Sequence, residues 1–438
     1  MNFNFLFACF LILSFLYLYF NNKVLYLTFL IITVFIAVPK VVALFNNTAY
    51  PIISVQKVLV VIMTAILLRN KKFYLNPLKW PIIFYFIMVL PSIIVNPLSS
   101  IEFFSNFLTI FIPPLFLLNY LNYDNVPRVV DFTSSLIIMT CVYGLFTVIV
   151  SDNFIINFIT ESVPKNGHKL LSNYSEREAA VRSLRLQSFI NHPIRFGFIL
   201  AMFLPLYILI LFRRKSIKDF IFAFFSILCL LLVNSRSPIL FLLVSLLIGF
   251  AYSSIDYKWK LTRVFALLMP IGVLIITVTK SNYLIAVRAL IDSSVDAGGS
   301  SSDMRSKQLV ATFNVLKNDL IFGKGFDATQ EIVRQDVVTD LYGAESWLFG
   351  TLIDYGMWGV FFGLLFFFQF FKALSFKNSK NSSLSRNIRG ILIGTSIGYF
   401  IFILLTGEMD TLGIFLIGQI MFYKIGLMEK YYMSLSIN

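Results

Sequence analysis

The chain has 438 residues, of which 58% are hydrophobic and 13% are charged. A soluble domain carries about 25% charged residues, so this composition excludes a soluble globular protein and indicates an integral membrane protein. The net charge of +14 is spread over short loops between apolar stretches, a distribution that is typical of membrane-topology signals and excludes a basic nucleic-acid-binding face.

The apolar stretches predict an all-α, polytopic bundle of about 12–14 membrane-spanning helices, each of which needs roughly 20 mainly apolar residues. Thirteen segments stand out, and they cover residues 3–20, 24–45, 51–68, 80–96, 103–119, 132–150, 189–212, 219–233, 238–253, 263–280, 344–371, 390–405 and 408–428. The first has neither a basic start nor a small-residue cleavage site, so we expect a retained span rather than a signal peptide. Interruptions at Pro39-Lys40 and Asn46-Asn47 leave twelve or fourteen spans open as alternatives.

Lys and Arg are distributed unequally among the short loops, and this distribution sets the predicted orientation. One set of loops is rich in them, at Arg69, Lys71, Lys72, Lys79, Arg213, Arg214, Lys215, Lys218, Lys258, Lys260, Arg263, Lys372, Lys377, Lys380, Arg386 and Arg389. The short loops between these, 97–102, 234–237 and 406–410, contain Arg236 as their single base. We therefore expect the basic loops and the C-terminus in the cytoplasm.

The same orientation places two long loops on the outer, periplasmic side. The resulting parts of the chain are N-terminal helices 1–150, a first outer loop 151–188, central helices 189–280, a second outer loop 281–343 and C-terminal helices 344–438. In the second loop the spacing of apolar residues predicts an amphipathic helix over Met304–Leu320 that lies at the outer membrane surface. On this helix we expect Arg305, Gln308 and Thr312 to share one face.

A first polar motif lies at the entrance to the segment 189–212. It contains Arg182 and Arg185 and, a few residues later, Asn191-His192-Pro193. Guanidinium groups at the outer rim of a span suit bidentate binding of a phosphate or pyrophosphate. The alternative for the two arginines is snorkelling or contact with lipid headgroups, although neither needs a neighbouring Asn-His-Pro.

A second motif combines Arg305 with Gly323-Lys324-Gly325. The Gly-Lys-Gly run lacks the remaining spacing of a nucleotide-binding loop, so we interpret it as a turn that ends the surface helix. Arg305 is the candidate functional residue of this motif. Its alternative is an ordinary solvated position on a helix.

A third motif begins at Glu345 and ends at Gly359. Glu345 opens an otherwise apolar segment near the outer interface, where a carboxylate is a candidate for chemistry. Its alternative is a favourable interaction with the positive end of the helix dipole. Gly359 and Gly363 form a small-xxx-small pair, which favours helix packing. Arg236 is a lone charge between two spans, facing either lipid headgroups or an outer cavity.

Together these motifs resemble the O-antigen polymerase and O-antigen ligase superfamily of bacterial inner membranes, whose polytopic bundles are related to the GT-C glycosyltransferases. The patterns behind the resemblance are matched by Arg185, Ser188, His192 and Pro193, by Arg305, Phe322, Gly323 and Gly325, and by Glu345, Ser346, Leu348, Gly356 and Gly359. Ligases typically carry His-Asn where this chain carries Glu345-Ser346. The resemblance therefore favours the polymerase branch and leaves the ligase branch open.

The resemblance implies an enzyme that polymerises undecaprenyl-pyrophosphate-linked repeat units into O-antigen or capsular polysaccharide, with its active site facing the periplasm. It implies catalytic roles for Glu345 as base and for Arg185 and Arg305 as a pyrophosphate clamp. The expected substrate-binding residues are Arg182, Arg236, Asn191 and His192, and His192 is also an alternative base.

We expect neither a metal nor another cofactor, because the outer loops contain no Asp-x-Asp motif and the cysteines, Cys9, Cys141 and Cys229, all lie in apolar segments. The expected partners are lipid-linked donor and acceptor glycans, the bilayer and a chain-length-regulating co-polymerase, with no nucleic acid. The alternatives are a ligase that transfers glycan to lipid A-core and a flippase for lipid-linked oligosaccharide. A flippase should carry polar residues within its spans and have two similar halves, whereas here the hydrophilic residues are concentrated in the outer loops.

Overall fold

The computed structural model describes residues 3–38, 42–45, 53–69, 73–95, 100–150, 153–155, 157, 186, 188–190, 192–233, 235–253, 302–317, 319–334, 341, 346–374 and 383–435. Within these ranges the chain is built from helices, and the predicted all-α polytopic membrane protein is confirmed. The described residues also contain a short antiparallel pair of strands, β1 (Ala43–Phe45) and β2 (Ile53–Ser54).

Twelve of the thirteen predicted segments contain a helix, and the remaining segment, 263–280, lies outside the described residues. The helices are α1 (Phe3–Phe20), α2 (Val24–Ile36), α3 (Val55–Arg69), α4 (Lys79–Val95), α5 (Ser100–Tyr120), α6 (Val126–Val150), α9 (Pro193–Arg214), α10 (Ile217–Leu232), α11 (Arg236–Tyr252), α16 (Trp347–Leu374), α17 (Ser383–Thr406) and α18 (Leu412–Leu435). By length and composition, 6 helices of the described chain could cross a membrane, and the shorter apolar helices include α1, α2, α4 and α11. The segment predicted over 24–45 is helical only to Ile36, because the approach to Pro39 disfavours the helical backbone.

The chain divides into two compact units. The first consists of Met1–Asn76, Phe104–Leu243 and Asp410–Asn438, and the second of Pro77–Phe103 and Val244–Met409.

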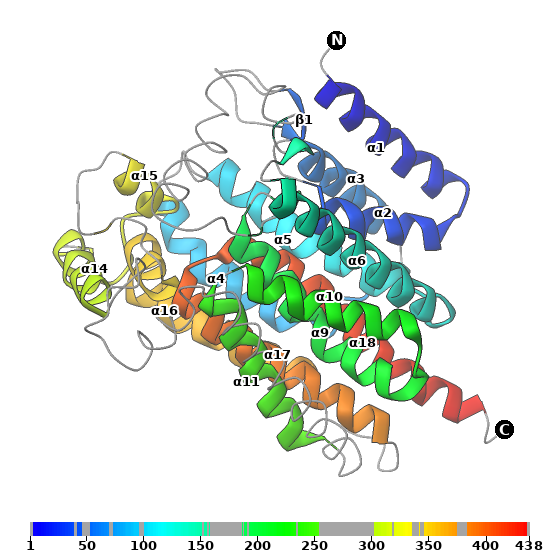
Figure 1. The fold of residues 1–438 in the computed structure, drawn as a ribbon. Helices are drawn as coiled ribbons and strands as arrows, with labels where there is room; N and C mark the ends of the chain where they lie inside the picture. The colour runs from blue at the N-terminus through cyan, green and yellow to red at the C-terminus, as the bar shows by residue number, and fades with distance from the viewer. Residues whose placement is uncertain are drawn as a thin grey trace. The chain divides into compact units, whose positions relative to one another are not determined.

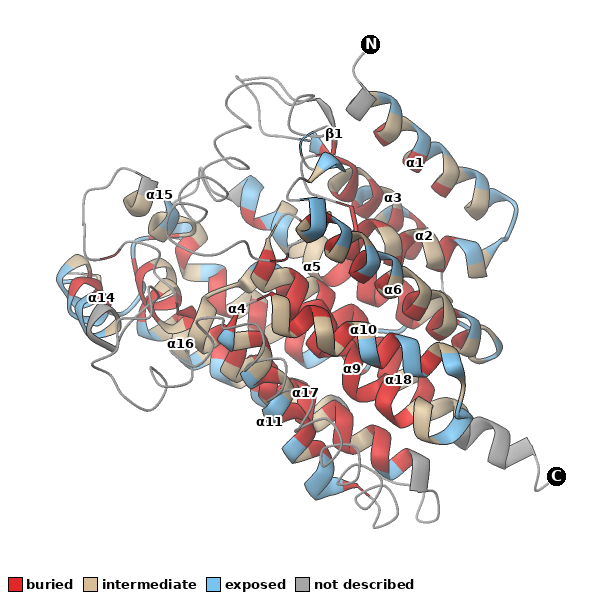
Figure 2. Ribbon diagram, viewed as in Figure 1, coloured by how far each residue is buried: buried red, intermediate tan, exposed pale blue. Residues whose placement is uncertain are grey.

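α9 forms the core of the first unit. Every residue from Phe196 to Leu209 is buried, as expected for a helix that is apolar on all sides. α10 and α18 pack against α9 (Figure 1), and buried residues continue along α18 (Figure 2). Gly418 permits the contact with α18, since a Cβ there would lie 2.7 Å from Cε of Met202.

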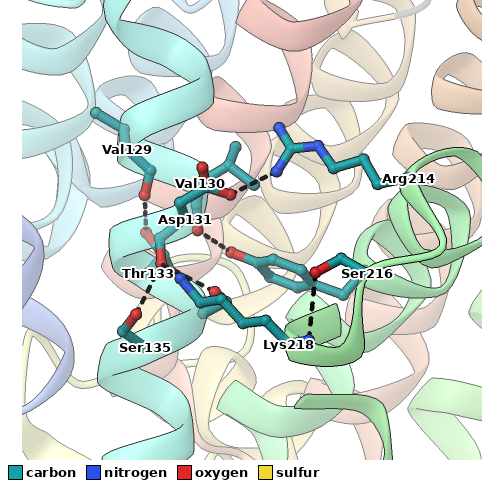
Figure 3. A network of polar contacts seen from close by, with 10 residues as sticks. Val129, Val130, Asp131, Thr133, Ser135, Arg214, Ser216 and Lys218 are labelled. Carbon is teal, nitrogen blue, oxygen red and sulfur yellow. Dashed lines mark hydrogen bonds and ion pairs between the residues drawn. The ribbon is translucent and has the colours of Figure 1, made fainter. Parts of the chain in front are cut away.

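A polar network joins the C-terminal end of α9 to the first part of α6 (Figure 3). The Arg214 guanidinium forms an ion pair with the Asp131 carboxylate at 2.5 Å, and Lys218 Nζ donates to the Asp131 carbonyl at 2.8 Å. The Tyr207 hydroxyl donates to the carbonyl of Val130. Because the ion pair is well exposed, the buried tyrosine contributes more to this junction than the ion pair does.

Other contacts in the first unit also join helix ends. The Asn119 side chain exchanges two hydrogen bonds, of 2.8 and 3.0 Å, with the backbone of Tyr74. The Gln56 amide donates to the carbonyls of Val34 and Val38, where α2 ends. In each case the orientation predicted from Lys and Arg places both segments on the same side of the membrane.

In the second unit α16, which covers most of the segment predicted over 344–371, is broken and folds back on itself. Gly356 has a non-helical backbone (φ 65°, ψ −163°). The Trp347 ring lies 5.8 Å from the Phe367 ring, and a Cβ on Gly363 would lie 2.5 Å from the same indole. Residues 347 and 363 of a straight helix would be about 24 Å apart. The half 347–355 therefore returns alongside the half 357–374.

α4 packs along α16 (Figure 1) and is joined to it by a side-chain hydrogen bond. Pro91 lies inside α4 and has no N–H to donate to the carbonyl of Ile87, four residues earlier. The indole N–H of Trp358 donates to that carbonyl at 2.9 Å. Trp358, which belongs to the third motif, thus replaces the backbone N–H that Pro91 lacks.

Candidate functional site

The described part of the second long loop, 281–343, is folded on the turn of α16. Two helices are described in it, α14 (Ser302–Val315) and α15 (Ala328–Arg334), and both pack against α16. α14 ends at Val315 and not at Leu320, and α15 was not predicted. The two helices share a small apolar core, whose members are Ala311, Val315, Ala328, Ile332, Leu341 and Ile353. This core fixes the loop to the membrane helices.

One face of α14, which carries Gln308 and Thr312, is turned towards the protein. Gln308 and Thr312 are fully buried, and Arg305 on the same face is half-buried. The exposed side of the helix carries both polar residues, such as Lys307, and apolar ones, such as Phe313. The predicted common face of the three polar residues is therefore present, and it lines the interior of the loop structure.

Arg305 is held at the C-terminal end of α17. Its Nη2 donates to the carbonyl of Leu405 at 3.0 Å, in the last turn of that helix. α17 stops at Gly407, whose φ of 65° allows the chain to leave the helix. A guanidinium at this place interacts favourably with the negative end of the helix dipole and satisfies a carbonyl that has no partner within the helix.

The turn after α14 is inserted into the break of α16. In an unbroken helix the N–H groups of residues 357 and 358 would bind the carbonyls of residues 353 and 354. Both pairs are instead satisfied by the turn, through Lys324 N to Ile353 O (2.8 Å), Gly325 N to Asp354 O (3.1 Å), Met357 N to Leu320 O (2.9 Å) and Trp358 N to Ile321 O (3.0 Å). This exchange joins the second motif to the third.

Asp354 also binds the loop through its side chain. Its Oδ1 accepts from the N–H of Thr329 at 2.8 Å and from the Thr329 hydroxyl at 2.7 Å. Thr329 belongs to the first turn of α15, where backbone N–H groups lack partners within the helix. Asp354 was not predicted as a site residue, although a carboxylate in an apolar segment is costly and could have identified it.

The first unit contains the other described candidates, His192 and Arg236. His192 precedes α9 with an extended backbone (φ −144°, ψ 120°), and Pro193 occupies the first helical position, which its fixed φ favours. Arg236 is exposed at the start of α11. The starts of α9 and α11 are close together, because a Cβ on Gly197 would lie 3.0 Å from Pro238.

Sequence reasoning missed Arg195, one turn into α9. Its Nη2 lies 3.4 Å from the carbonyl of Phe35 at the end of α2. The remaining predicted site residues, Arg182, Arg185, Asn191 and Glu345, lie outside the described residues. Among the residues that are described, no three His, Cys, Asp or Glu side chains come together as metal ligands would.

Part of the chain that contains this arrangement matches a known protein family. Residues 221–368 match the model of a protein family described as O-antigen ligase. No curated protein and no solved structure matches the chain. The matched residues include Arg236, Arg305, the inserted turn and the break of α16. Residues 221–368 are therefore similar to the O-antigen ligase family, and this match supports the resemblance to the O-antigen ligase and polymerase superfamily.

Proposed function

We propose that the protein polymerises undecaprenyl-pyrophosphate-linked repeat units into O-antigen or capsular polysaccharide at the periplasmic face of the bacterial inner membrane. The observation that carries the proposal is the placement of Arg305. Its half-buried guanidinium is held beside the outer end of α17, within the region that matches the family. A cation fixed at such a rim suits a lipid-linked pyrophosphate, whose charged group lies at the interface while its chain stays in the bilayer.

In the proposed reaction a hydroxyl of the acceptor glycan attacks the anomeric carbon of the donor. The new bond joins the hydroxyl oxygen to that carbon, and the bond from the carbon to the pyrophosphate oxygen breaks. The bonding electrons leave with undecaprenyl pyrophosphate, and the hydroxyl proton passes to the carboxylate of Glu345. The product is a glycan longer by the transferred chain.

Arg305 and Arg185 are assigned to the charge that develops on the leaving pyrophosphate. Fixed donors aimed at developing charge contribute several kcal/mol of transition-state stabilisation, of the order of 3 kcal/mol for one donor. The planar fork of arginine matches two phosphate oxygens at once. The assigned substrate-binding residues are Arg182, Arg236, Asn191 and His192.

The preference for polymerase over ligase rests on Glu345-Ser346, where ligases typically have His-Asn. The matched family is described as O-antigen ligase, so a ligase is the second candidate. The two differ in their products. A defective polymerase leaves core lipid with at most one repeat unit, because a separate ligase still attaches it. A defective ligase leaves core lipid bare, with long chains retained on undecaprenyl pyrophosphate.

The test is therefore a chromosomal deletion of this gene, complemented by the wild type or by Arg305→Ala. Glycan on core lipid and glycan on undecaprenyl pyrophosphate are resolved by size. We expect single repeat units on core lipid in the deletion strain and in the variant. Bare core lipid with long lipid-linked chains would replace polymerase by ligase, and lipid-linked units confined to the inner leaflet would replace it by flippase.

A further inference from the structure

Asp354 has no task in the proposed chemistry, yet it binds the outer loop at three points. Its carbonyl accepts from Gly325 N at 3.1 Å, and its carboxylate accepts from both the N–H and the hydroxyl of Thr329. The two loop residues lie on either side of the turn that leads into α15. One residue of the membrane hairpin thus determines where α15 begins.

The carboxylate acts as the capping group of α15. Asn, Asp, Ser and Thr cap a helix by accepting a hydrogen bond from an N–H of its first turn. Here the acceptor comes from another helix and binds the N–H of Thr329, the second residue of α15. The Thr329 hydroxyl has one proton to donate, and Oδ1 of Asp354 at 2.7 Å is closer than the carbonyl of Gly350 at 3.3 Å.

The cap is linked to Arg305 through packed residues. Ile353, next to Asp354, is fully buried against Ala311 and Val315 of α14 and against Ala328 of α15. The opposite end of α14 is attached to α17 through Arg305. α14 therefore extends from the hairpin, where the cap lies, to the outer end of α17.

We propose that Asp354 and Thr329 form a latch that positions α14, and with it Arg305. The importance of this position rests on the proposed function, because a donor stabilises a developing charge only if it is held in place beforehand. None of the four backbone hydrogen bonds of the inserted turn uses the Asp354 carboxylate or Thr329, although one of them ends on the Asp354 carbonyl. Breaking the latch should therefore loosen α14 and α15 while the hairpin stays folded.

Two pairs of variants isolate the latch. Thr329→Val keeps the shape of the side chain and loses the hydroxyl, whereas Thr329→Ser keeps the hydroxyl. Asp354→Leu loses the acceptor at similar size, whereas Asp354→Asn keeps an acceptor oxygen and removes the charge. If the hydrogen bonds matter, Thr329→Ser and Asp354→Asn should behave like the wild type. A purely steric role would not predict this result.

The position of α14 is measured directly by electron-electron spin distances. Labels are attached at Lys307 on α14 and at Phe368 on the second half of α16, both exposed, in the full chain with its three cysteines replaced. We expect Thr329→Val and Asp354→Leu to broaden the distance distribution, and Thr329→Ser and Asp354→Asn to keep it narrow. A narrow distribution in both disrupting variants would overturn the latch. This measurement does not depend on the reaction, so it separates failure of the latch from failure of the proposed function.

The kinetic readout is the split between kcat and KM with lipid-linked repeat units. Misplacing a catalytic group by about 1 Å costs up to 100-fold in rate, so we expect kcat to fall roughly 10- to 100-fold in the two disrupting variants. KM should change little, because the loss concerns the transition state. An unchanged kcat in variants with broadened distances would overturn the positioning role of the latch.

Discussion

Gly323 and Gly356 meet backbone to backbone where the turn after α14 enters the break of α16. Both have positive φ, 70° and 65° respectively. A Cβ on Gly323 would lie 2.6 Å from the backbone N of Gly356, and a Cβ on Gly356 would overlap the carbonyl of Ile321. Neither position accepts a side chain without separating the loop from the membrane hairpin.

Gly323→Ala and Gly356→Ala should each destabilise the protein by about 2 kcal/mol or more, since the left-handed backbone alone costs a non-glycine residue roughly 1–2 kcal/mol. The measurement is thermal unfolding in detergent. Gly350→Ala is the control, because it lies in the same helix with nothing within 4 Å of its Cβ position. Equal unfolding temperatures for Gly356→Ala and Gly350→Ala would contradict the inserted turn.

The bond from Trp358 to Ile87 predicts a coupling between two distant substitutions. Trp358→Phe should leave the Ile87 carbonyl without its donor and cost about 1–3 kcal/mol. In a Pro91→Ala background residue 91 regains an N–H that can bind the same carbonyl. Trp358→Phe should therefore cost less in that background. Additive effects in the double-mutant cycle would show that the indole does not replace the missing donor.

The proposed function should require an arginine, and not only a positive charge, at position 305. Arg305→Ala should abolish long glycan chains at normal protein level, and Arg305→Lys should restore them poorly, because an ammonium cannot form the bidentate fork. Lys307→Ala is the matched control, since Lys307 is exposed on the same helix. Full chain length in the lysine variant would reduce Arg305 to a generic positive charge.

The predicted orientation is checked by cysteine labelling. In a background without native cysteines, single cysteines at Lys165 and at Asp296 should react with an impermeant thiol reagent in cells whose outer membrane is permeabilised. A cysteine at Ser379 should react only after lysis. The reverse pattern would invert the topology and move the candidate residues to the cytoplasm.

Hydropathy located the helices well because a span needs a long apolar stretch wherever it lies. It could not reveal the hairpin of α16, since the composition of 344–371 is the same for a straight helix and for one that returns at Gly356. Helical periodicity found α14 and the common face of Arg305, Gln308 and Thr312. It did not find α15, whose seven residues owe their helical state to the cap by Asp354 and to burial of Ile332.

The candidate site was predicted only in part, because its contacts join residues that are far apart in the sequence. The motifs identified residue types that suit a pyrophosphate, and the structure joins Gly323 of the second motif to Gly356 of the third. The contact of Arg305 with Leu405 involves residues 100 positions apart. No local pattern specifies such a pair, because it depends on how α14 lies against α17.

The polymerase proposal is tested most directly by reconstituting the purified protein in liposomes with a synthetic undecaprenyl-pyrophosphate repeat unit and sizing the products. The wild type should convert single units into a ladder of longer lipid-linked chains. Glu345→Gln keeps the size of the side chain and removes the proton acceptor, so its rate should fall by roughly 10²-fold or more. Its stability should change by less than about 1 kcal/mol. Unelongated units in the wild-type reaction, with transfer only after lipid A-core is added, would contradict the polymerase and identify a ligase.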